Sequence, residues 1–443
     1  MFRTRLKSII PLGLFQRVEP FGHLVESIVA QVWMGFPARG TSIIGVTGTD
    51  GKTTTSAFIS AMLNDAGIKT GLMNTIGYGT PESWQDNYVH MTTVSIWELL
   101  RRIKDFKAQE VSWIVIETTS HALAQNRVWG LPYQIAVMTN VTHEHLDYHK
   151  TFERYRDAKR KLFKIADRGN LKIGVINAED GSENLFQSDI TVPILYGLKK
   201  GDLRVSKIDS QPTETSFDLN FNVGHSGSRR LYNDESARVT IHLPGEFNVY
   251  NALAAAAVGD VLGLSGDQIA HGLASLASVE GRMNRIDEGQ SFTVLVDFAH
   301  TPDSFSKLLP ELARTTKGKL IVLFGSAGRR DEQKRAIQGE IAGKWADTVI
   351  LTEEDNRDIP GESILEDMAA GAKKAGKVID KDLFLIPDRT TAIEYAMQIA
   401  GPKDVVILLG KGHEKTIERA DGEHPWDETQ TARKAIRKLS SAS

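Results

Sequence analysis

The chain has 443 residues, with 53 lysines and arginines against 56 aspartates and glutamates, a net charge of −3 and no cysteine. At roughly 100–200 residues per domain, this length predicts two to four domains, and the balanced charge argues against nucleic acid or an anionic membrane as the main partner. The lack of cysteine excludes a disulfide scaffold, a cysteine nucleophile, an iron–sulfur cluster and a cysteine-ligated zinc site, and it fits a reducing cytoplasm.

The first residues, MFRTRLKSIIPLGLF, carry three basic side chains before a short apolar stretch. Pro11 and Gly13 interrupt that stretch, no small-residue cleavage site follows and Glu19 comes soon after, so we expect no signal peptide. No later stretch reaches the roughly 18 uncharged apolar residues of a spanning helix. We therefore expect a soluble, cytoplasmic protein, in which residues 1–40 form one or two helices rather than an independent domain.

Runs typical of buried strands alternate with amphipathic helical stretches over most of the chain, which predicts parallel sheets covered by helices. The first set of strands is expected at 42–46, 113–116, 135–138 and 173–176, and the second at 293–296, 320–324, 348–351 and 405–409. Residues 200–245 alternate in polarity between the two sets and predict an antiparallel elaboration. Two helices, near 248–262 and 265–276, precede a domain boundary that we place at Gly281.

A glycine-rich turn follows the first predicted strand, where residues 47–55 read TGTDGKTTT and a helical run comes next. The backbone N–H groups of such a turn bind phosphate oxygens, and the positive end of the helix dipole adds to the attraction. Lys52 can place its charge on the β- and γ-phosphates, and the Thr53 hydroxyl can reach Mg²⁺. Five residues rather than the four of a strict P-loop separate Gly45 from Gly51. The order of strand, turn, Gly-Lys-Thr and helix favours an ATP site over a structural glycine turn.

Polar residues follow the next two predicted strands. Glu117 comes at the carboxyl end of its strand, where a further magnesium ligand is expected beside a phosphate loop, although a helix cap is an equal alternative. The strand at 135–138 leads into TNVTHEHLDYH, in which three histidines and two acids fit either a zinc site or a site for Mg²⁺ and a polar substrate. Lys159, in the helix after that, is by itself typical of a solvated helix lysine.

Together these pieces resemble the Mur ligase family, the ATP-dependent amino-acid ligases of peptidoglycan assembly. The motifs run from about Gly45 to Thr429 in the order of the family. They are GTDGKTT at 48, TT at 92, ETTSHAL at 117, Gln125 with Arg127, TNVTHEHLDYH at 139, YRDAKRKLF at 155, LPGEFNVYNALAA at 243, GRMNR at 281, VDFAHTPDS at 296, FGSAGRRDEQKR at 324 and GKGHE at 410. The resemblance implies an α/β fold with a P-loop-type central ATPase domain (41–281), a Rossmann-like C-terminal domain (282–443) and a truncated N-terminal segment (1–40).

The motifs are most similar to those of the members that join a diamino acid to UDP-N-acetylmuramoyl-L-alanyl-D-glutamate. In such ligases ATP phosphorylates the substrate carboxylate, and the amine attacks the acyl phosphate. Because charge develops on the transferring phosphoryl oxygens, a lysine and magnesium ions should carry most of the catalysis. The resemblance implies that Lys52, Glu117, His145 and Lys159 are catalytic. It places Thr53 and Glu117 at a first Mg²⁺, and Glu117, His145 and a CO₂-carbamylated, anionic Lys159 at a second.

The resemblance also implies residues that bind the substrates. For ATP these are Gly48, Thr49, Asp50, Gly51, Lys52, Thr53 and Thr54 of the loop, Asn248 and Asn251 on the adenine side, and Arg282, Asp297 and His300, which approach the nucleotide when the last domain closes. Closure of that domain excludes water from the acyl phosphate. For the UDP-muramoyl substrate they are Thr92, Thr93, Thr119, Gln125 and Arg127, with Thr119 in place of the usual serine.

The last domain is expected to select the amino acid. The residues that match its binding positions are Arg330, Gly410 and Glu414, together with Glu354, Asp355, Asn356 and Arg357, which align with the Asp-Asn-Pro-Arg motif for meso-diaminopimelate. Arg330 can pair with a substrate carboxylate. The retained Arg357 favours meso-diaminopimelate over L-lysine, because the extra carboxylate pairs with a guanidinium. We expect a monomer that binds neither nucleic acid nor a membrane.

The front of the chain departs from the family, whose members usually begin with a full uridine-binding domain. This departure keeps open a Mur-like or folylpolyglutamate-synthase-like ligase with a different carboxylate acceptor, although the ETTSHAL stretch with Gln125 and Arg127 argues against folate. A non-catalytic nucleotide-binding regulator is a third alternative. Such a regulator would be expected to lack at least one of four catalytic residues, and the chain has all four of them. They are Lys52, Glu117, His145 and Lys159.

Overall fold

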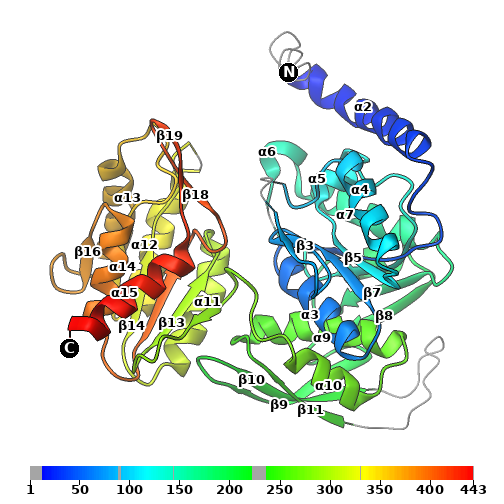
Figure 1. Ribbon diagram of the computed structural model, residues 1–443. Helices are drawn as coiled ribbons and strands as arrows, with labels where there is room; N and C mark the ends of the chain where they lie inside the picture. Colours follow the sequence, from blue (N-terminus) through cyan, green and yellow to red (C-terminus); the bar gives the residue numbers. More distant parts are fainter. Residues whose placement is uncertain (1–11, 88–90, 143, 222–235, 330, 443) are drawn as a thin grey trace. The chain divides into compact units, whose positions relative to one another are not determined.

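The computed structural model describes residues 12–87, 91–142, 144–221, 236–329 and 331–442. The chain divides into two compact units, which Figure 1 draws as ribbons. Unit 1 comprises the chain up to Ile208 together with Phe217–Thr240 and Asn248–Leu276, and unit 2 comprises Asp209–Ser216, Ile241–Phe247 and Ala277–Ser443. Each unit contains a largely parallel sheet with helices, so the predicted α/β class is confirmed.

Unit 1 is built on an eleven-stranded sheet with the strand order β11-β10-β9-β8-β7-β6-β1-β5-β2-β3-β4. The strands are β1 (Ser42–Thr47), β2 (Thr70–Met73), β3 (Gly77–Gly79), β4 (Gln85–Asp86), β5 (Trp113–Glu117), β6 (Tyr133–Met138), β7 (Ile173–Asn177), β8 (Val192–Tyr196), β9 (Leu203–Ser210), β10 (Thr215–Phe221) and β11 (Ser236–Ile241). The helices are α2 (Leu12–Trp33), α3 (Lys52–Asp65), α4 (Ile96–Ala108), α5 (Ser120–Ala124), α6 (Leu146–His149), α7 (Phe152–Ala166), α8 (Glu183–Gln187), α9 (Glu246–Val261) and α10 (Gly266–Ala274).

The centre of this sheet brings three carboxyl ends together. Strand β1 lies between β5 and β6 and is parallel to both, with Val46 opposite Glu117 and Thr47 opposite Met138. Strands β5 and β2 follow on one side of β1 in the sheet, and β6 and β7 follow on the other side. The order of the strands therefore reverses at β1, and α/β proteins bind ligands at the carboxyl ends of the strands at such a point. All four strands predicted for this sheet are present. The predicted elaboration is present as β9, β10 and β11, and its antiparallel sense stays a prediction.

Helix α7 packs unusually close to the middle of β1. A Cβ atom added to Gly45 would lie 2.7 Å from the ring of Tyr133 and 2.8 Å from a methyl group of Leu162, a residue of α7. Tyr133 is fully buried, and its hydroxyl is 3.1 Å from that of Thr118. Only a residue without a side chain therefore fits between α7 and the sheet at this position.

Unit 2 contains a six-stranded sheet with the order β12-β13-β17-β14-β15-β16 and a two-stranded ribbon. Its strands are β12 (Asn284–Ile286), β13 (Thr293–Asp297), β14 (Leu320–Phe324), β15 (Thr348–Leu351), β16 (Leu383–Leu385), β17 (Val405–Leu409), β18 (Thr416–Arg419) and β19 (Gly422–Pro425). Its helices are α11 (Pro302–Thr315), α12 (Gln333–Trp345), α13 (Gly361–Lys374), α14 (Arg389–Ile399) and α15 (Glu428–Ala442). The strands predicted for this unit are confirmed, and β17 runs parallel to both β13 and β14.

A buried ion pair ties α14 to α15 in unit 2. The guanidinium of Arg389 and the carboxylate of Glu428 are both fully buried and lie 2.6 Å apart. Arg389 also donates hydrogen bonds to the backbone carbonyls of Glu353, at 3.0 Å, and Leu409, at 2.8 Å. The pair therefore fixes the ends of the strands that carry the residues predicted to bind the amino acid.

Replacing Arg389 with Met is expected to lower the free energy of unfolding by about 3–5 kcal/mol, because it leaves Glu428 buried without its partner. Urea unfolding measures the change. The matched control is Arg433→Met, which removes the partly exposed ion pair with Glu288 and is expected to cost about 0–1 kcal/mol. Equal losses in the two variants would contradict this assignment.

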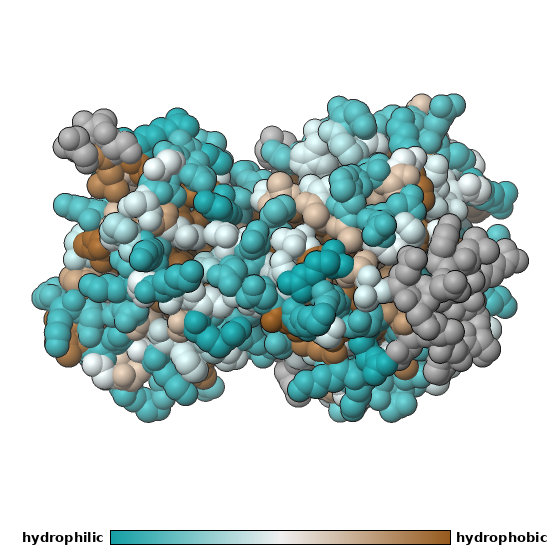
Figure 2. Space-filling view, turned by 90° about the horizontal axis from the view of Figure 1, so that it is seen from below, coloured by the Kyte–Doolittle hydropathy of each residue, from teal (hydrophilic) through white to brown (hydrophobic). Residues whose placement is uncertain are grey.

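Within the described residues, no helix combines the length and the apolar character needed to cross a membrane. The face of the molecule in Figure 2 is mostly hydrophilic, with apolar areas that are small and separate. Exposed apolar side chains of this scattered kind are normal on a folded protein.

Candidate active site

The predicted phosphate loop lies between β1 and α3. Gly48 has φ 155° and Gly51 has φ 79°, values that favour glycine. A Cβ atom on Gly48 would come within 1.8 Å of the Thr139 hydroxyl oxygen, and one on Gly51 within 2.1 Å of the Asn251 side-chain oxygen. The loop needs glycine at both positions because neighbouring side chains occupy the space where a Cβ atom would lie.

Asn140, the second residue after β6, fixes the loop from the other side. The Asn140 carbonyl accepts the Thr49 N–H at 2.8 Å, and the Asn140 side chain accepts the Asp50 N–H at 2.9 Å. Lys52 turns its ammonium back to the Thr49 carbonyl, at 2.6 Å, and Thr54 is buried in the first turn of α3. The ammonium of Lys52 therefore lies at the loop, where the sequence predicts the phosphates.

Glu117 is the centre of a buried polar network. Its carboxylate oxygen Oε2 accepts hydrogen bonds from the Thr53 hydroxyl at 3.0 Å, the Thr75 N–H at 3.0 Å and the Thr75 hydroxyl at 2.9 Å. The side chain is 2% exposed. The structure thus brings together Thr53 and Glu117, as the sequence predicted for the first metal. Hydroxyl and carboxylate oxygens are the donors that Mg²⁺ prefers, so these residues fit such an ion.

Lys159 is a buried lysine, and this overturns the reading of the isolated residue as a solvated helix lysine. Its side chain is 1% exposed, and its ammonium donates to the Gly48 carbonyl at 2.5 Å and lies 4.2 Å from the centre of the Tyr155 ring. Burial, together with the nearby charge of Lys52, holds the pKa of Lys159 well below its ordinary value. A lysine in this setting favours the neutral amine, which is the nucleophilic form.

His145 lies beside the same tyrosine but is partly exposed. Its ring centre is 6.1 Å from that of Tyr155 and 4.7 Å from that of His121. The residue has φ 53° and its side chain is 45% exposed. His143 lies outside the described residues, and those residues contain no cluster of three or more His, Cys, Asp or Glu side chains that would hold a metal ion. A zinc site of such side chains therefore finds no support in the described part of this segment.

The two asparagines predicted for the adenine side lie on α9 next to the loop. Asn248 and Asn251 are buried, and the Asn251 amide donates to the Asn248 side-chain oxygen at 3.0 Å. The Thr55 hydroxyl, one turn into α3, donates to Asn251 at 3.2 Å. Helix α9 is thereby bonded to the first turn of α3, and both asparagines lie close to Gly51.

The residues predicted to bind the UDP-muramoyl substrate adjoin Glu117. The Thr75 hydroxyl donates to that of Thr92 at 3.0 Å, and the Thr93 hydroxyl donates to the Glu117 backbone carbonyl at 2.9 Å and lies 3.2 Å from the Thr119 hydroxyl. Thr119 also begins α5, where its hydroxyl accepts the Ala122 N–H.

The remaining two residues of this set are bonded to each other. Arg127 is 5% exposed, and its guanidinium donates to the Gln125 side chain at 2.9 Å and to the backbone carbonyl of Thr93. All five residues predicted for the UDP-muramoyl substrate therefore adjoin the network around Glu117. The structure brings them together within unit 1.

Three further residues predicted for ATP gather around Phe298 in unit 2. The guanidinium of Arg282 lies 4.8 Å from the centre of the Phe298 ring, and the His300 ring centre lies 4.7 Å from it. Asp297 ends β13, and its carboxylate accepts the N–H groups of Met283 and Ala299, each at 2.7 Å. Burial raises the pKa of Asp297 above its ordinary value.

The residues predicted for the amino acid surround a buried lysine that the sequence reasoning did not single out. Lys411 is 1% exposed and donates to the carboxylates of Asp355, at 2.8 Å, and Glu414, at 2.6 Å. A Cβ atom on Gly410, which has φ 103°, would lie 2.7 Å from Glu354 Oε2. Burial raises the pKa of Glu414 above its ordinary value despite its contact with Lys411.

Two buried oxygens of this group lack a hydrogen-bond partner among the described residues, namely Oε2 of Glu354 and Oδ1 of Asn356. Buried polar atoms are nearly always hydrogen-bonded, so two exceptions only two residues apart in sequence call for a donor. Arg357 has φ 56° and donates to the Glu418 carboxylate at 2.7 Å and the Gly328 carbonyl at 2.6 Å. Arg330 lies outside the described residues.

His413 makes the stability of unit 2 dependent on pH. Burial and the positive charges of Arg282, Lys415, Lys411 and His300 lower the pKa of His413 from 6.5 to about 3. The folded chain therefore keeps His413 neutral, whereas the unfolded chain binds a proton below pH 6.5. Stability falls as the pH drops from the unfolded pKa toward the folded one, by about 2 kcal/mol at pH 5.

His413→Gln is expected to remove that part of the pH dependence. The measurement is the difference between the free energies of unfolding at pH 7.5 and pH 5, which should shrink by about 2 kcal/mol in the variant. His424→Gln, a change of a half-exposed histidine paired with Asp421, serves as the control and should leave the difference as it is. An unchanged difference in His413→Gln would show that the histidine is protonated in the folded chain.

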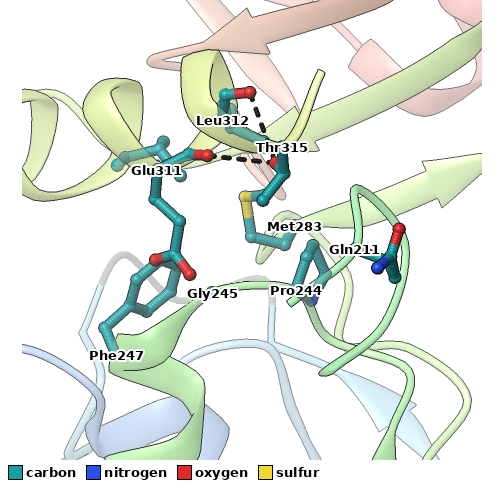
Figure 3. Close-up of a pocket in the computed structure, with 9 residues that line it drawn as sticks. Gln211, Pro244, Gly245, Phe247, Met283, Glu311, Leu312 and Thr315 are labelled. Carbon is teal, nitrogen blue, oxygen red and sulfur yellow. Dashed lines mark hydrogen bonds between the residues drawn. The ribbon is translucent and has the colours of Figure 1, made fainter. Parts of the chain in front are cut away.

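A pocket in unit 2 is too small to be a substrate site. Figure 3 shows its lining, in which Met283, Leu312 and Phe247 supply apolar surface and Thr315 donates to the carbonyls of Glu311 and Leu312. Its volume is about 10 Å³, which holds about one water molecule.

Comparisons with known proteins agree with the motifs. The Mur ligase middle domain matches residues 46–259, and the glutamate ligase domain of Mur ligases matches residues 281–412. A UDP-N-acetylmuramyl-tripeptide synthetase of Roseiflexus sp. (strain RS-1) is 40% identical over 434 residues, which cover 95% of this chain and 83% of the relative. The chain belongs to the Mur ligase family. It is accordingly an ATP-dependent ligase.

Another relative and two solved structures are also similar to this Mur ligase. The UDP-N-acetylmuramoyl-L-alanyl-D-glutamate–2,6-diaminopimelate ligase of Geobacillus thermodenitrificans (strain NG80-2) is 37% identical and covers 95% of this chain and 84% of the relative. A solved structure of a ligase with that name has 29% identity and a TM-score of 0.67, covering 96% and 83% of the two chains. Folylpolyglutamate synthase of Mycobacterium tuberculosis, at 17% identity, TM-score 0.66 and coverage of 94% and 95%, shares the fold.

Sequence reasoning missed several residues of the Mur ligase site. Thr75 donates twice to Glu117, yet it lies in a segment, MNTIGYG, that carries no motif signal. The hydroxyl groups of Tyr155 and Thr49 form a hydrogen bond of 2.9 Å, and the Tyr155 ring makes a cation–π contact with Lys159. Lys411 belongs to the GKGHE motif. Its position in a glycine-rich turn directly after β17 was the sequence feature that could have identified it as a site residue.

Proposed function

We propose that this Mur ligase is a tripeptide synthetase of peptidoglycan assembly, which joins a diamino acid to UDP-N-acetylmuramoyl-L-alanyl-D-glutamate with cleavage of ATP to ADP and phosphate. The observation that carries the proposal is the network of Glu117. Its carboxylate is bonded to Thr53 of the ATP loop, and its backbone carbonyl is bonded to Thr93 of the acceptor set, at 3.0 and 2.9 Å. A carboxylate to be phosphorylated would be held beside the phosphate loop.

The chain's own residues supply most of the binding in this proposal. The loop from Gly48 to Thr54 binds the phosphates of ATP; because the N–H groups of Thr49 and Asp50 are bonded to Asn140, those from Gly51 to Thr54 are the ones that hold the phosphates. The Lys52 ammonium neutralises charge on the transferring phosphoryl group. Asn248 and Asn251 lie on the adenine side. Arg282, Asp297 and His300 belong to the domain that we place at 282–443, following the central domain at 41–281 and the segment at 1–40.

Two Mg²⁺ ions are part of the proposal. Thr53 and Glu117 would hold the first, and Glu117, His145 and carbamylated Lys159 the second; bound there, the ions would stabilise the negative charge of the phosphoryl oxygens. The burial of Lys159 against the Gly48 carbonyl supports the carbamate, because a lysine at this place is removed from solvent and directed at the loop. The anionic carbamate would then offer oxygen donors in place of an ammonium.

For the amine substrate we favour meso-diaminopimelate over L-lysine. The unpaired buried oxygens of Glu354 and Asn356 are acceptors for an ammonium group, and the guanidinium of Arg357 is a partner for the additional carboxylate. Arg330, Asp355, Gly410 and Glu414 complete the proposed amino-acid site.

The experiment that tests the function is phosphate release from ATP and Mg²⁺ with UDP-N-acetylmuramoyl-L-alanyl-D-glutamate, with meso-diaminopimelate, L-lysine or L-ornithine as the amine. Turnover that requires both substrates, and is fastest with meso-diaminopimelate, is expected. If no amine supported turnover while the protein still bound ATP, the acceptor would differ, and a ligase with another carboxylate substrate would be the better conclusion.

Arg357→Ala is expected to raise KM for meso-diaminopimelate about tenfold or more and to change kcat and the KM for ATP much less, because only the distal carboxylate loses its partner. Steady-state kinetics measure the split. Arg314→Ala, in an exposed position of α11, is the control. An equal rise for L-lysine would mean that Arg357 acts on the fold through Glu418 and not on the carboxylate.

A further inference from the structure

Strand β18 runs beside residues 353–357, a segment of unit 2 that includes part of the proposed amino-acid site. Arg357 forms an isolated parallel β-bridge with Arg419, and the Arg357 N–H donates to the Glu418 carbonyl at 3.0 Å. The Arg419 guanidinium holds the Glu353 carboxylate with two hydrogen bonds, at 3.0 and 2.6 Å. The two-stranded ribbon of β18 and β19 (Figure 1) is thus joined to both ends of the segment.

Glu418 makes three contacts with this segment. Its backbone N–H donates to Asp355 Oδ1 at 2.9 Å, its backbone carbonyl accepts the Arg357 N–H, and its carboxylate accepts from Arg357 Nε at 2.7 Å. Arg357 has φ 56°, a conformation that few residues other than glycine adopt, so its backbone needs contacts of this kind to hold it. One residue of β18 therefore bonds two residues of the proposed site.

The ribbon itself does not account for an acid at position 418. Glu418 lies directly opposite Glu423 of β19. Like charges directly opposite each other on neighbouring strands destabilise their pairing. The carboxylate of Glu418 has its partner outside the ribbon, in the guanidinium of Arg357. The contact with Arg357 is therefore the one that gives this carboxylate a role.

The guanidinium of Arg357 is held at two of its three nitrogens. Nε donates to Glu418, and Nη1 donates to the Gly328 carbonyl at 2.6 Å. Because the group is planar, two anchored nitrogens fix its plane and the direction of the third nitrogen. Among the residues that the structure describes, Nη2 has no hydrogen-bond partner. Nη2 is therefore the nitrogen that can donate to a carboxylate of the substrate.

The exposure of the pair indicates what Glu418 contributes. The side chains of Arg357 and Glu418 are 20% and 43% exposed. Ion pairs with this access to solvent add little to stability, and water limits how far the charge of Glu418 cancels that of Arg357. The contact therefore acts mainly on the position of the guanidinium and less on its charge.

We propose that Glu418 is a positioning residue that sets the selectivity for an amine with a second carboxylate. It fixes the guanidinium of Arg357 so that Nη2 stays available to that carboxylate. An amine whose side chain ends in an ammonium group gains nothing from this arrangement. The inference rests on the proposed function and deepens it, and it assigns a role to a residue that lies outside the motifs of the sequence.

The test compares Glu418→Ala and Glu418→Gln in steady-state kinetics with meso-diaminopimelate and with L-lysine. Alanine releases Nε, so the KM for meso-diaminopimelate is expected to rise about fivefold or more, with kcat and the KM for L-lysine changed less than about twofold. Glutamine still accepts from Nε through its side-chain oxygen, and should keep the KM for meso-diaminopimelate within about twofold of the original value. Asp421→Asn, at an exposed position between β18 and β19, is the matched control and should change neither KM.

A double-mutant cycle tests whether Glu418 acts through Arg357. In the Arg357→Ala background, Glu418→Ala should cause no further rise in the KM for meso-diaminopimelate, because the guanidinium that it positions is absent. Additive effects would overturn the proposal, and so would an unchanged KM in Glu418→Ala, equal losses in the alanine and glutamine variants, or an equal rise for both amines. A lower KM in Glu418→Ala would instead make Glu418 a competitor of the substrate carboxylate.

Thermal unfolding of each variant shows whether the fold is kept. Glu418→Thr, which removes the carboxylate and suits a strand, is a second variant and should behave as Glu418→Ala does. The original chain separates this inference from the function. Turnover without a preference for meso-diaminopimelate over L-lysine would refute the role of Glu418 and leave the ligase function standing. Absence of turnover with either amine would refute the proposed function, and this inference with it.

Discussion

Glu117→Gln is expected to lower kcat by about 10²–10³-fold, with a smaller change in the KM for ATP. The amide keeps the shape of the carboxylate and still accepts from Thr53 and Thr75, but it removes the negative charge that would hold a magnesium ion. Removing one preorganised electrostatic group typically costs this factor in the chemical step. The measurement is phosphate release as a function of Mg²⁺ concentration, in which the variant should require more Mg²⁺ for half-maximal rate.

Glu153→Gln is the matched control for this prediction. It makes the same change at a solvent-exposed position in the first turn of α7 and should leave kcat within about twofold, since a surface change away from such features has little effect. The proposed metal site would be contradicted by an unchanged Mg²⁺ dependence in Glu117→Gln, because its carboxylate would then serve only to bond Thr53 and Thr75.

Lys159→Ala is expected to lower kcat by about 10³-fold or more. The substitution removes a fully buried side chain at the Gly48 carbonyl and, with it, the proposed carbamate donor to the second ion. A short carboxylic acid such as acetate fits the space left by the side chain and restores a carboxylate there. Activity should therefore rise with acetate concentration, and ATP hydrolysis dependent on acceptor and amine is the readout.

Lys164→Ala, one turn further along α7 and half-exposed, is the control and should keep its activity with or without acetate. Rescue by acetate separates the proposed role from a purely structural one. If Lys159 only filled space, a small carboxylate would not restore activity; if it supplied a negative charge, acetate would replace that charge. Full activity of Lys159→Ala would refute the second metal site, and inactivity without rescue would leave Lys159 as a residue that supports the loop.

Much of the fold could be predicted because the strands are short apolar runs bounded by polar residues. The predicted strand at 348–351 matches β15, and that at 405–409 matches β17. The small strands β3 and β4 were not predicted, because three residues of GYG and two of QD carry no periodic signal. Burial of single polar residues was also out of reach, since Lys159 and Arg389 have no neighbours in sequence that distinguish them from surface cations.

The site illustrates the same limit. Glu117 and the loop were predictable, because residues at the carboxyl ends of adjacent parallel strands meet at one edge of the sheet. Thr75 and Tyr155 were not, because they reach the site from a turn after β2 and from α7, and only the packed structure determines which side chains of those segments face Glu117 and Lys159. The local sequence pattern does not show which side chains of distant segments come into contact.

Gly45 acts as a spacer for the catalytic chemistry without taking part in it. Leu162, which meets Gly45, lies one turn of α7 beyond Lys159, so the distance between helix and sheet also determines how far Lys159 reaches toward the loop. One added methyl group at Gly45 would push α7 outward, because Tyr133 is fully buried and has little room to yield. Gly45 has no polar side chain, yet it is expected to tolerate as few replacements as the proposed metal ligand Lys159, and natural variation at the two positions is expected to be equally low.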